Sequence, residues 1–125
     1  DVDRILPTSF KSTFTIETQA LVDTLERASL LARDSKHVVK LTVQNGQVEI
    51  RSTAPEIGQV VEEIIPRHQE GEEMSIAFNA RYMTEALKAI EEEETEIHFT
   101  GALSPFMLKP VQGEHTIHLI VPVRT

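Results

Sequence analysis

The sequence predicts an α+β domain in which a βαβββ unit occurs twice, with two helices packed on one side of antiparallel sheets. Two observations support this prediction. Short runs of alternating apolar and polar residues, bounded by Gly, Pro and Asn, are typical of strands with one buried face. The same order of elements also recurs 61 residues apart, from Thr18 to Asn79, and such a recurrence indicates a duplicated unit.

The first half contains one predicted helix and four predicted strands. Phe14–Ile16 alternates as a short strand, and Thr18 is the predicted N-cap of the helix that follows. Two strands then flank Asn45 and Gly46, a pair that suits a tight hairpin because both residues tolerate positive φ. A further strand is predicted from Gln59 to Ile65. The apolar positions of the helix are Leu21, Leu25 and Ala28.

The second half repeats this order. Met74, Ile76 and Phe78 alternate as a strand, and Asn79 is the predicted N-cap of the second helix. Three strands are predicted after that helix. The helix has its apolar positions at Met83, Leu87 and Ile90, and the strands centre on Ile97 and Phe99, on Phe106 and Leu108, and on Ile117, Leu119 and Val121.

We expect a single domain over residues 1–125, whose halves of about 1–66 and 72–125 are joined by the polar linker Arg67–Glu72. The chain opens at Asp1 without an initiator Met or a signal-like segment. This opening favours a piece excised from a longer protein.

Charge is distributed unevenly along the chain. The net charge is −8, which by itself argues against tight binding to phosphate. The acid, however, lies mainly in predicted strands and turns. Residues 18–33 have a net charge of zero and residues 79–90 a net charge of +1, so neither predicted helix carries a net negative charge. The solvent-exposed face of each helix has charged residues spaced for ion pairs within the helix. These are Asp23 and Arg27 in the first helix and Arg81, Glu85 and Lys88 in the second.

The composition excludes several classes of protein. There is no Cys, so neither a disulfide framework nor a thiolate metal site exists, and no apolar run is long enough to span a membrane as a helix. No nucleotide-binding, metalloprotease or nucleophile-elbow motif occurs. His115 and His118 are spaced to point to opposite faces of a strand, and His98 points outward beside Glu96. We therefore expect no catalytic residue, metal or cofactor.

The C-terminal segment from Leu119 to Thr125 is an apolar strand that ends at Pro122, because proline cannot donate to a ladder. Such a segment is either a core strand with a frayed tip or an exposed wall of a groove that binds peptides. The residues of the segment leave both interpretations open.

Several stretches, taken together, resemble the third domain of the bacterial β sliding clamp, the processivity factor of the replicative DNA polymerase. They are Arg4–Pro7, Arg27–Leu31, Phe78–Tyr82, Ala86–Ile90, Phe99–Phe106 and Val121–Arg124. The resemblance covers essentially the whole chain. It implies the DNA-clamp fold and a closed dimeric ring of three such domains per protomer in the bacterial cytoplasm, with helices lining the hole.

The resemblance also implies site residues and partners. Polymerase, clamp loader and repair proteins are expected to insert short peptides, with a Gln and a Leu-Phe-like end, into a groove shared with a neighbouring domain. Arg27, Arg81 and Lys88 are expected to face the encircled duplex, and Leu30 and Leu31 to meet the other protomer. The expected groove residues are Ile5, Leu103, Pro105, Leu119 and Val121 for the deep apolar end and Asn79, Tyr82, Pro122, Val123 and Arg124 for the rim.

Two other functions remain open on the sequence. A stand-alone interaction module of the same architecture would never form a ring. A small enzyme would pair His98 or His118 with a carboxylate. A parent reading frame about three times this length would favour the clamp over the module, whereas an activity lost on changing either histidine to Ala would favour the enzyme.

Overall fold

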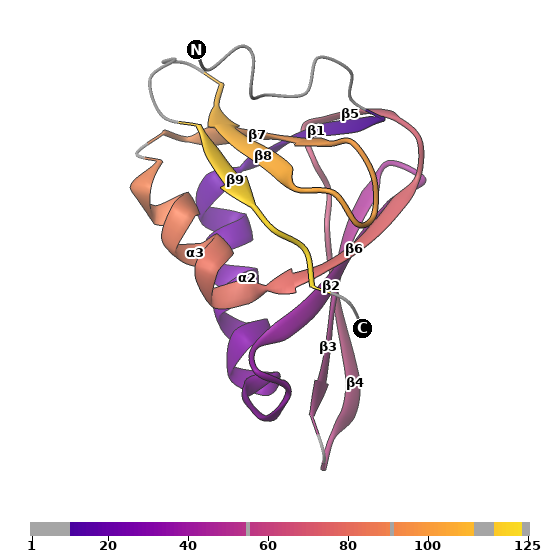
Figure 1. Ribbon diagram of the computed structural model, residues 1–125, viewed down its shortest axis with the longest axis vertical. Helices are drawn as coiled ribbons and strands as arrows, with labels where there is room; N and C mark the ends of the chain where they lie inside the picture. Colours follow the sequence, from indigo (N-terminus) through magenta and orange to yellow (C-terminus); the bar gives the residue numbers. More distant parts are fainter. Residues whose placement is uncertain (1–10, 55, 91, 112–116, 124–125) are drawn as a thin grey trace.

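The computed structural model describes residues 11–54, 56–90, 92–111 and 117–123 (Figure 1). Ile5, His115 and Arg124 therefore lie outside the described residues. The helices are α2 (Thr18–Leu31) and α3 (Ala80–Ala89), with a 3₁₀ turn, η1, at Arg33–Ser35. The strands are β1 (Ser12–Glu17), β2 (Val38–Gln44), β3 (Gln47–Ala54), β4 (Gly58–Ile64), β5 (His68–Gly71), β6 (Met74–Asn79), β7 (Glu94–Phe99), β8 (Phe106–Pro110) and β9 (His118–Ile120).

The strands form two antiparallel sheets, in the orders β5-β1-β7-β8-β9 and β4-β3-β2-β6. The predicted duplication is present, because β1-α2-β2-β3-β4 and β6-α3-β7-β8-β9 have the same order of elements. The two units exchange their first strands. β1 pairs with β7 of the second unit, and β6 pairs with β2 of the first.

The segment predicted as the linker, Arg67–Glu72, contains a strand that the sequence analysis did not predict, β5. This strand pairs with β1 and forms the edge of the five-stranded sheet. Backbone bonds from Arg67 to the carbonyl of Thr15 (2.8 Å) and from Glu72 to that of Lys11 (2.7 Å) flank the ladder. A polar edge strand held by backbone bonds lacks the apolar alternation by which strands are recognised in a sequence.

The N-cap prediction is confirmed for one helix and wrong for the other. The side-chain oxygen of Asn79 accepts from the backbone N–H groups of Arg81 (2.9 Å) and Tyr82 (3.2 Å). Thr18, by contrast, is the first residue of α2, and its hydroxyl bonds to that of Thr95 at 2.7 Å. Its backbone N–H donates to the carbonyl of Glu93 at 2.8 Å, so a neighbouring segment takes over one of the bonds at this helix start.

The two helices lie side by side against the sheets (Figure 1). The predicted apolar positions on both helices are buried. Four phenylalanines form a chain of ring contacts through the core. Their centroid distances are 5.9 Å for Phe14–Phe99, 5.0 Å for Phe99–Phe106 and 5.5 Å for Phe78–Phe106. The last contact joins β6 to β8 and therefore joins the two sheets.

The predicted hairpin between β2 and β3 is confirmed, because Asn45 (φ 52°) and Gly46 (φ 74°) both have positive φ. Across the described residues, no helix combines the length and apolar character needed to cross a membrane.

A candidate peptide-binding groove at the C-terminal tail

The C-terminal tail connects the exposed edges of the two sheets. After β9, the edge of the five-stranded sheet, the chain runs toward β6, the edge of the four-stranded sheet (Figure 1). The backbone N–H of Val123 donates to the carbonyl of Ala77 in β6 at 2.9 Å. The tail from Val121 to Val123 is therefore held against β6, and the side chain of Val121 remains exposed.

A groove of about 690 Å³ lies between this tail and the first turns of α3. Its apolar walls remain in contact with water. Leu119 is 46% exposed, Val121 69% and Tyr82 68%. Exposed apolar groups clustered in a concave site are typical of a surface that binds a partner. Of the predicted groove residues, the structure brings together Asn79, Tyr82, Leu119, Val121, Pro122 and Val123.

Four lining residues of this groove were missed by sequence reasoning. Tyr82 was expected from the family resemblance, and Glu85 and Ala86 follow it by three and four positions, so the helical period could have added them. His118 and Ile120 belong to β9, and the Nε2 atom of His118 is buried without a hydrogen-bond partner among the described residues. The lining of the groove therefore includes two polar side chains, Glu85 and His118, as well as apolar residues.

Asn79 has a structural role at the groove. Its amide oxygen caps α3, and its Nδ2 group donates to the carbonyl of Lys36 at 3.2 Å. Lys36 and His37 both adopt positive φ, of 58° and 62°, and the carbonyl of His37 accepts from the N–H of Ala80 at 2.9 Å. This left-handed turn and the cap fix the start of α3 and hold the Asn79 side chain in one orientation.

The remaining predicted groove residues are not gathered at the same place. Leu103 is 67% exposed and lines an adjoining hollow of about 400 Å³, which shares Val123 with the groove. Pro105 is exposed but lines neither space. Ile5 and Arg124 lie outside the described residues.

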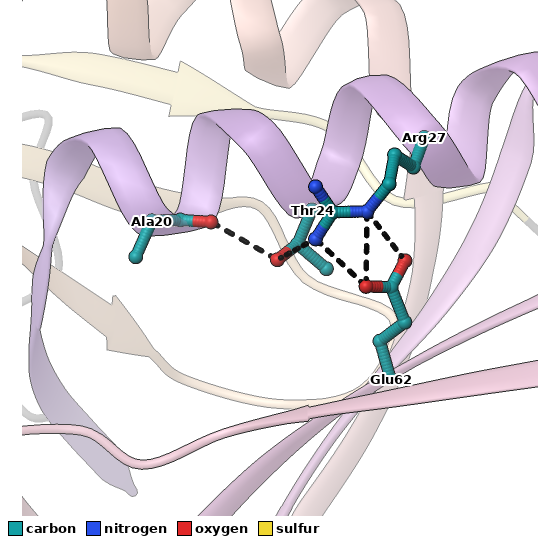
Figure 2. Close-up of polar contacts among 4 residues, drawn as sticks. All are labelled: Ala20, Thr24, Arg27 and Glu62. Atoms are coloured by element: carbon teal, nitrogen blue, oxygen red, sulfur yellow. Dashed lines mark hydrogen bonds and ion pairs between the residues drawn. The ribbon is translucent and has the colours of Figure 1, made fainter.

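The basic residues of the helices are exposed, but two of them are already paired. Figure 2 shows Arg27 of α2 reaching Glu62 of β4. The Arg27 Nη2 atom lies 2.8 Å from Glu62 Oε1, and its Nε atom donates to the same carboxylate. This hydrogen bond and the nearby charge raise the pKa of the Arg27 guanidinium. Nη2 also reaches the hydroxyl of Thr24, which donates to the carbonyl of Ala20.

Lys88 of α3 pairs with Glu26 of α2, with Nζ and Oε2 2.7 Å apart. The predicted ion pairs within each helix are therefore replaced by pairs between elements. Arg81 is exposed, and its side chain forms no ion pair with the residues that the structure describes. Its charge is the least compensated of the three predicted DNA-facing cations.

Leu30 and Leu31 end α2. Leu30 is 69% exposed and Leu31 is half-buried, so the pair presents apolar surface beside the last helical turn. An exposed leucine of this extent at the end of a helix is suited to contact with another chain or domain.

His98 is held in a network on the outer face of the five-stranded sheet. Its Nδ1 atom lies 3.1 Å from the Thr13 hydroxyl, and its Nε2 atom lies 3.1 Å from Glu96 Oε1. Burial lowers the pKa of His98, and the Glu96 carboxylate opposes this effect in part. Within the described ranges, no group of three or more His, Asp or Glu is placed to hold a metal ion.

Comparison with known proteins identifies a family. The profile described as "DNA polymerase III beta subunit, C-terminal domain" matches residues 3–124. The chain is 43% identical over 123 residues to a protein named beta sliding clamp from Halalkalibacterium halodurans, and 40% identical over 126 residues to that of Staphylococcus aureus. These matches cover 97% and 100% of the chain, but 32% and 33% of the relatives. The chain thus spans about a third of their length.

Solved structures give the same result. The DNA polymerase III beta chain from Streptococcus pneumoniae superposes with a TM-score of 0.92 at 39% identity. The DNA polymerase sliding clamp from Bacillus subtilis superposes with a TM-score of 0.90 at 41% identity. Each covers all of this chain, which corresponds to 34% and 33% of those chains. The DNA-clamp fold expected from the sequence is therefore confirmed.

Proposed function

Because the chain belongs to the family of C-terminal domains of the DNA polymerase III beta protein, we propose that it works as the third domain of a sliding clamp. In this proposal the full-length parent has two further domains of the same fold and closes into a dimeric ring around duplex DNA. The ring tethers polymerase and repair proteins without catalysing a reaction itself. The share of the relatives' length that the chain spans, about a third, supports this assignment.

The observation that carries the proposal is the groove between the C-terminal tail and α3. Burying a Leu or Phe side chain against Leu119 and Val121 is worth about 1.5 to 3 kcal/mol. Peptides with a Gln and a Leu-Phe-like end have the side chains that this site requires. Asn79 and Tyr82 line the groove, and in this proposal they form its rim, where a hydrogen-bonding residue of the peptide sets its position.

The helices face the duplex in this proposal. The Arg27–Glu62 and Lys88–Glu26 pairs reduce the positive charge that these cations present. A ring held by topology needs little phosphate affinity, because strong contacts would oppose sliding. Arg81 is then the cation best placed to attract the duplex, and Leu30 and Leu31 supply apolar contact to the other protomer.

The experiment that tests this function compares the chain with its full-length parent. A peptide with a Gln and a Leu-Phe end is titrated into each by calorimetry. We expect clear binding to the parent and weak binding to the chain, because the other half of the pocket belongs to the neighbouring domain. Micromolar or tighter binding to the chain would show that this half is sufficient.

Variants make the titration specific for the groove. Val121→Ala and Arg124→Ala should both weaken binding to the parent. Val61→Ala is the matched control, because Val61 is a valine of β4 that is 42% exposed and lies outside the groove. If all the variants bind as the parent does, the peptide does not use this groove.

A second measurement tests the ring. A clamp loaded on closed circular DNA should remain bound at high salt and slide off after the circle is cut, because a topological link does not depend on charge. A stand-alone interaction module would be insensitive to cutting. Equal retention on circular and linear DNA would therefore favour the module.

A further inference from the structure

A second hollow of about 620 Å³ adjoins the groove on the other side of the tail. It lies over the outer face of the four-stranded sheet. Three cations line it, Lys36, Lys40 and Arg51, and no carboxylate lines it among the described residues. In a chain with a net charge of −8, a concave site lined by three cations is a local reversal of the surface charge. We call this site the basic hollow.

The basic hollow places two cations opposite each other. Lys40 of β2 and Arg51 of β3 are Cα partners in the antiparallel ladder. Like charges directly across a ladder are destabilising. Arg51 is compensated by Glu49, 3.1 Å away, and donates to Gln59 at 3.2 Å. Lys40 forms no ion pair with any residue that the structure describes, so an added carboxylate would relieve the repulsion.

The basic hollow is continuous with the groove. Asn79 and Val123 line both sites, so the tail at Val123 forms the wall between them. A peptide whose Gln lies beside Asn79 therefore needs to extend past Val123 to reach Lys40. The hollow also has apolar surface from Val38, Val39 and Val123, which suits a polypeptide backbone and its side chains.

From these observations we infer that the basic hollow binds acidic side chains of the partner peptide, on the Gln side of the segment held in the groove. This inference rests on the proposed function and adds a determinant of partner choice to it. Nucleic acid is the less suitable ligand, because Glu49 and Glu63 lie on the same face of the sheet and repel a phosphate chain. A short acidic segment that reaches only Lys40 and Arg51 meets less of this repulsion than a long phosphate chain does, because it need not pass over Glu63.

The test uses the full-length parent and labelled peptides that share one Gln and Leu-Phe core. The core is extended on its Gln side by two glutamates, two glutamines or two lysines, and affinity is measured by fluorescence anisotropy at low and high salt. We expect the Glu peptide to bind about threefold to tenfold more tightly than the Gln peptide at low salt, with the difference shrinking at high salt. Equal affinity of these two peptides overturns the inference.

Lys40→Glu is the informative variant, because the new carboxylate faces Arg51 and the protein should fold at least as well as before. It should bind the Gln peptide unchanged, lose the preference for Glu and gain a preference for the Lys peptide. Lys11→Glu is the matched control, since Lys11 precedes β1 in the other sheet. Loss of the Glu preference in the control as well as in Lys40→Glu overturns the inference.

A separate experiment distinguishes failure of the proposed function from failure of this inference. If no peptide with the core binds, the proposed function is wrong, and a core-free Glu-rich peptide is then crosslinked to the parent with carbodiimide. An amide bond between a peptide glutamate and Lys40, absent in Lys40→Gln, supports an acidic-peptide site by itself. The inference is overturned if no crosslink forms at Lys40. It is also overturned if an oligonucleotide prevents the crosslink and an uncoupled Glu-rich peptide does not.

Discussion

The backbone N–H of Val123 donates to the carbonyl of Ala77 across 2.9 Å, and this bond holds the C-terminal tail on the free edge of β6. The groove on one side of the tail and the basic hollow on the other both include Val123. The position of one backbone bond therefore shapes both sites.

Val123→Pro removes this donor, whereas Val123→Ala keeps it. We expect the proline variant to bind a Gln and Leu-Phe peptide about twofold to tenfold more weakly than the alanine variant, in line with one net hydrogen bond. Calorimetry on the full-length parent makes the comparison. Equal affinities of the two variants would show that the bond does not position the tail.

Asn79→Ala should lower the free energy of unfolding by about 0.5 to 2 kcal/mol, because α3 loses its cap. Asn79→Asp keeps the cap oxygen but loses the bond from Nδ2 to the Lys36 carbonyl, so its loss should be smaller. Urea denaturation measures both variants. Equal losses for Asp and Ala would mean that the bond to Lys36, and not the cap, is the main contribution.

Glu62→Gln should strengthen binding of the full-length ring to DNA at low salt, because Arg27 is freed from its carboxylate partner. Glu63→Gln is the matched control, since it removes the same charge from the opposite face of β4. The double variant Arg27→Gln/Glu62→Gln should lose the gain. An equal gain in the Glu63 variant would indicate a general effect of net charge instead.

His98 should make stability depend on pH. Burial lowers its pKa in the folded chain below the ordinary value of 6.5, so the unfolded chain binds the proton more readily. Its contribution to stability is therefore complete above the unfolded pKa and is lost as pH falls below it. We expect His98→Gln to show a weaker loss of stability between pH values of about 7.5 and 5.5 than the unchanged chain.

His68→Gln is the control for this experiment, because His68 is exposed and interacts weakly with Glu70 at 3.5 Å. It should keep the pH dependence of the unchanged chain. Denaturant titrations at each pH supply the free energies. Identical slopes for His98→Gln and His68→Gln would exclude His98 as the group responsible.

Gly71→Ala should destabilise the edge strand β5. Gly71 has φ of 99°, and a Cβ atom there would meet the backbone of Lys11 and Ser12. Gly46→Ala is the control, because Gly46 also has positive φ but an added Cβ there meets open space. We expect a larger drop in melting temperature for Gly71→Ala, with faster amide exchange in β5. Equal drops would show that positive φ alone is responsible.

Local features of the fold were predictable from the sequence. The hairpin at Asn45 and Gly46 follows from two residues that tolerate positive φ, and the cap at Asn79 follows from its side chain. The family resemblance followed from motifs spread along the chain and is confirmed by the match over residues 3–124. The prediction of a cap at Thr18 was wrong because Thr18 bonds to a segment that is distant in the sequence. Its partners there are Thr95 and Glu93.

Part of the groove was expected from the family resemblance, which named Tyr82, Leu119 and Val121. The apolar C-terminal segment by itself left a core strand and a groove wall open. Glu85 and Ala86 were missed although they lie one turn after Tyr82. The ion pair of Arg27 was missed for a different reason. Its partner Glu62 lies 35 residues away in a strand, and helical spacing favoured Asp23 instead.

Except for β5, the type and order of the elements followed from local sequence, because hydrophobic periods of 2 and 3.6 and turn residues act over a few neighbouring positions. Tertiary structure alone decided which strands pair. β1 and β6 each complete the sheet of the other unit, β5 joins an edge through backbone bonds, and the tail is fastened to β6. Backbone N–H and C=O groups are nearly the same for every residue, so a local pattern does not specify distant pairing partners. These are selected when the whole core is packed.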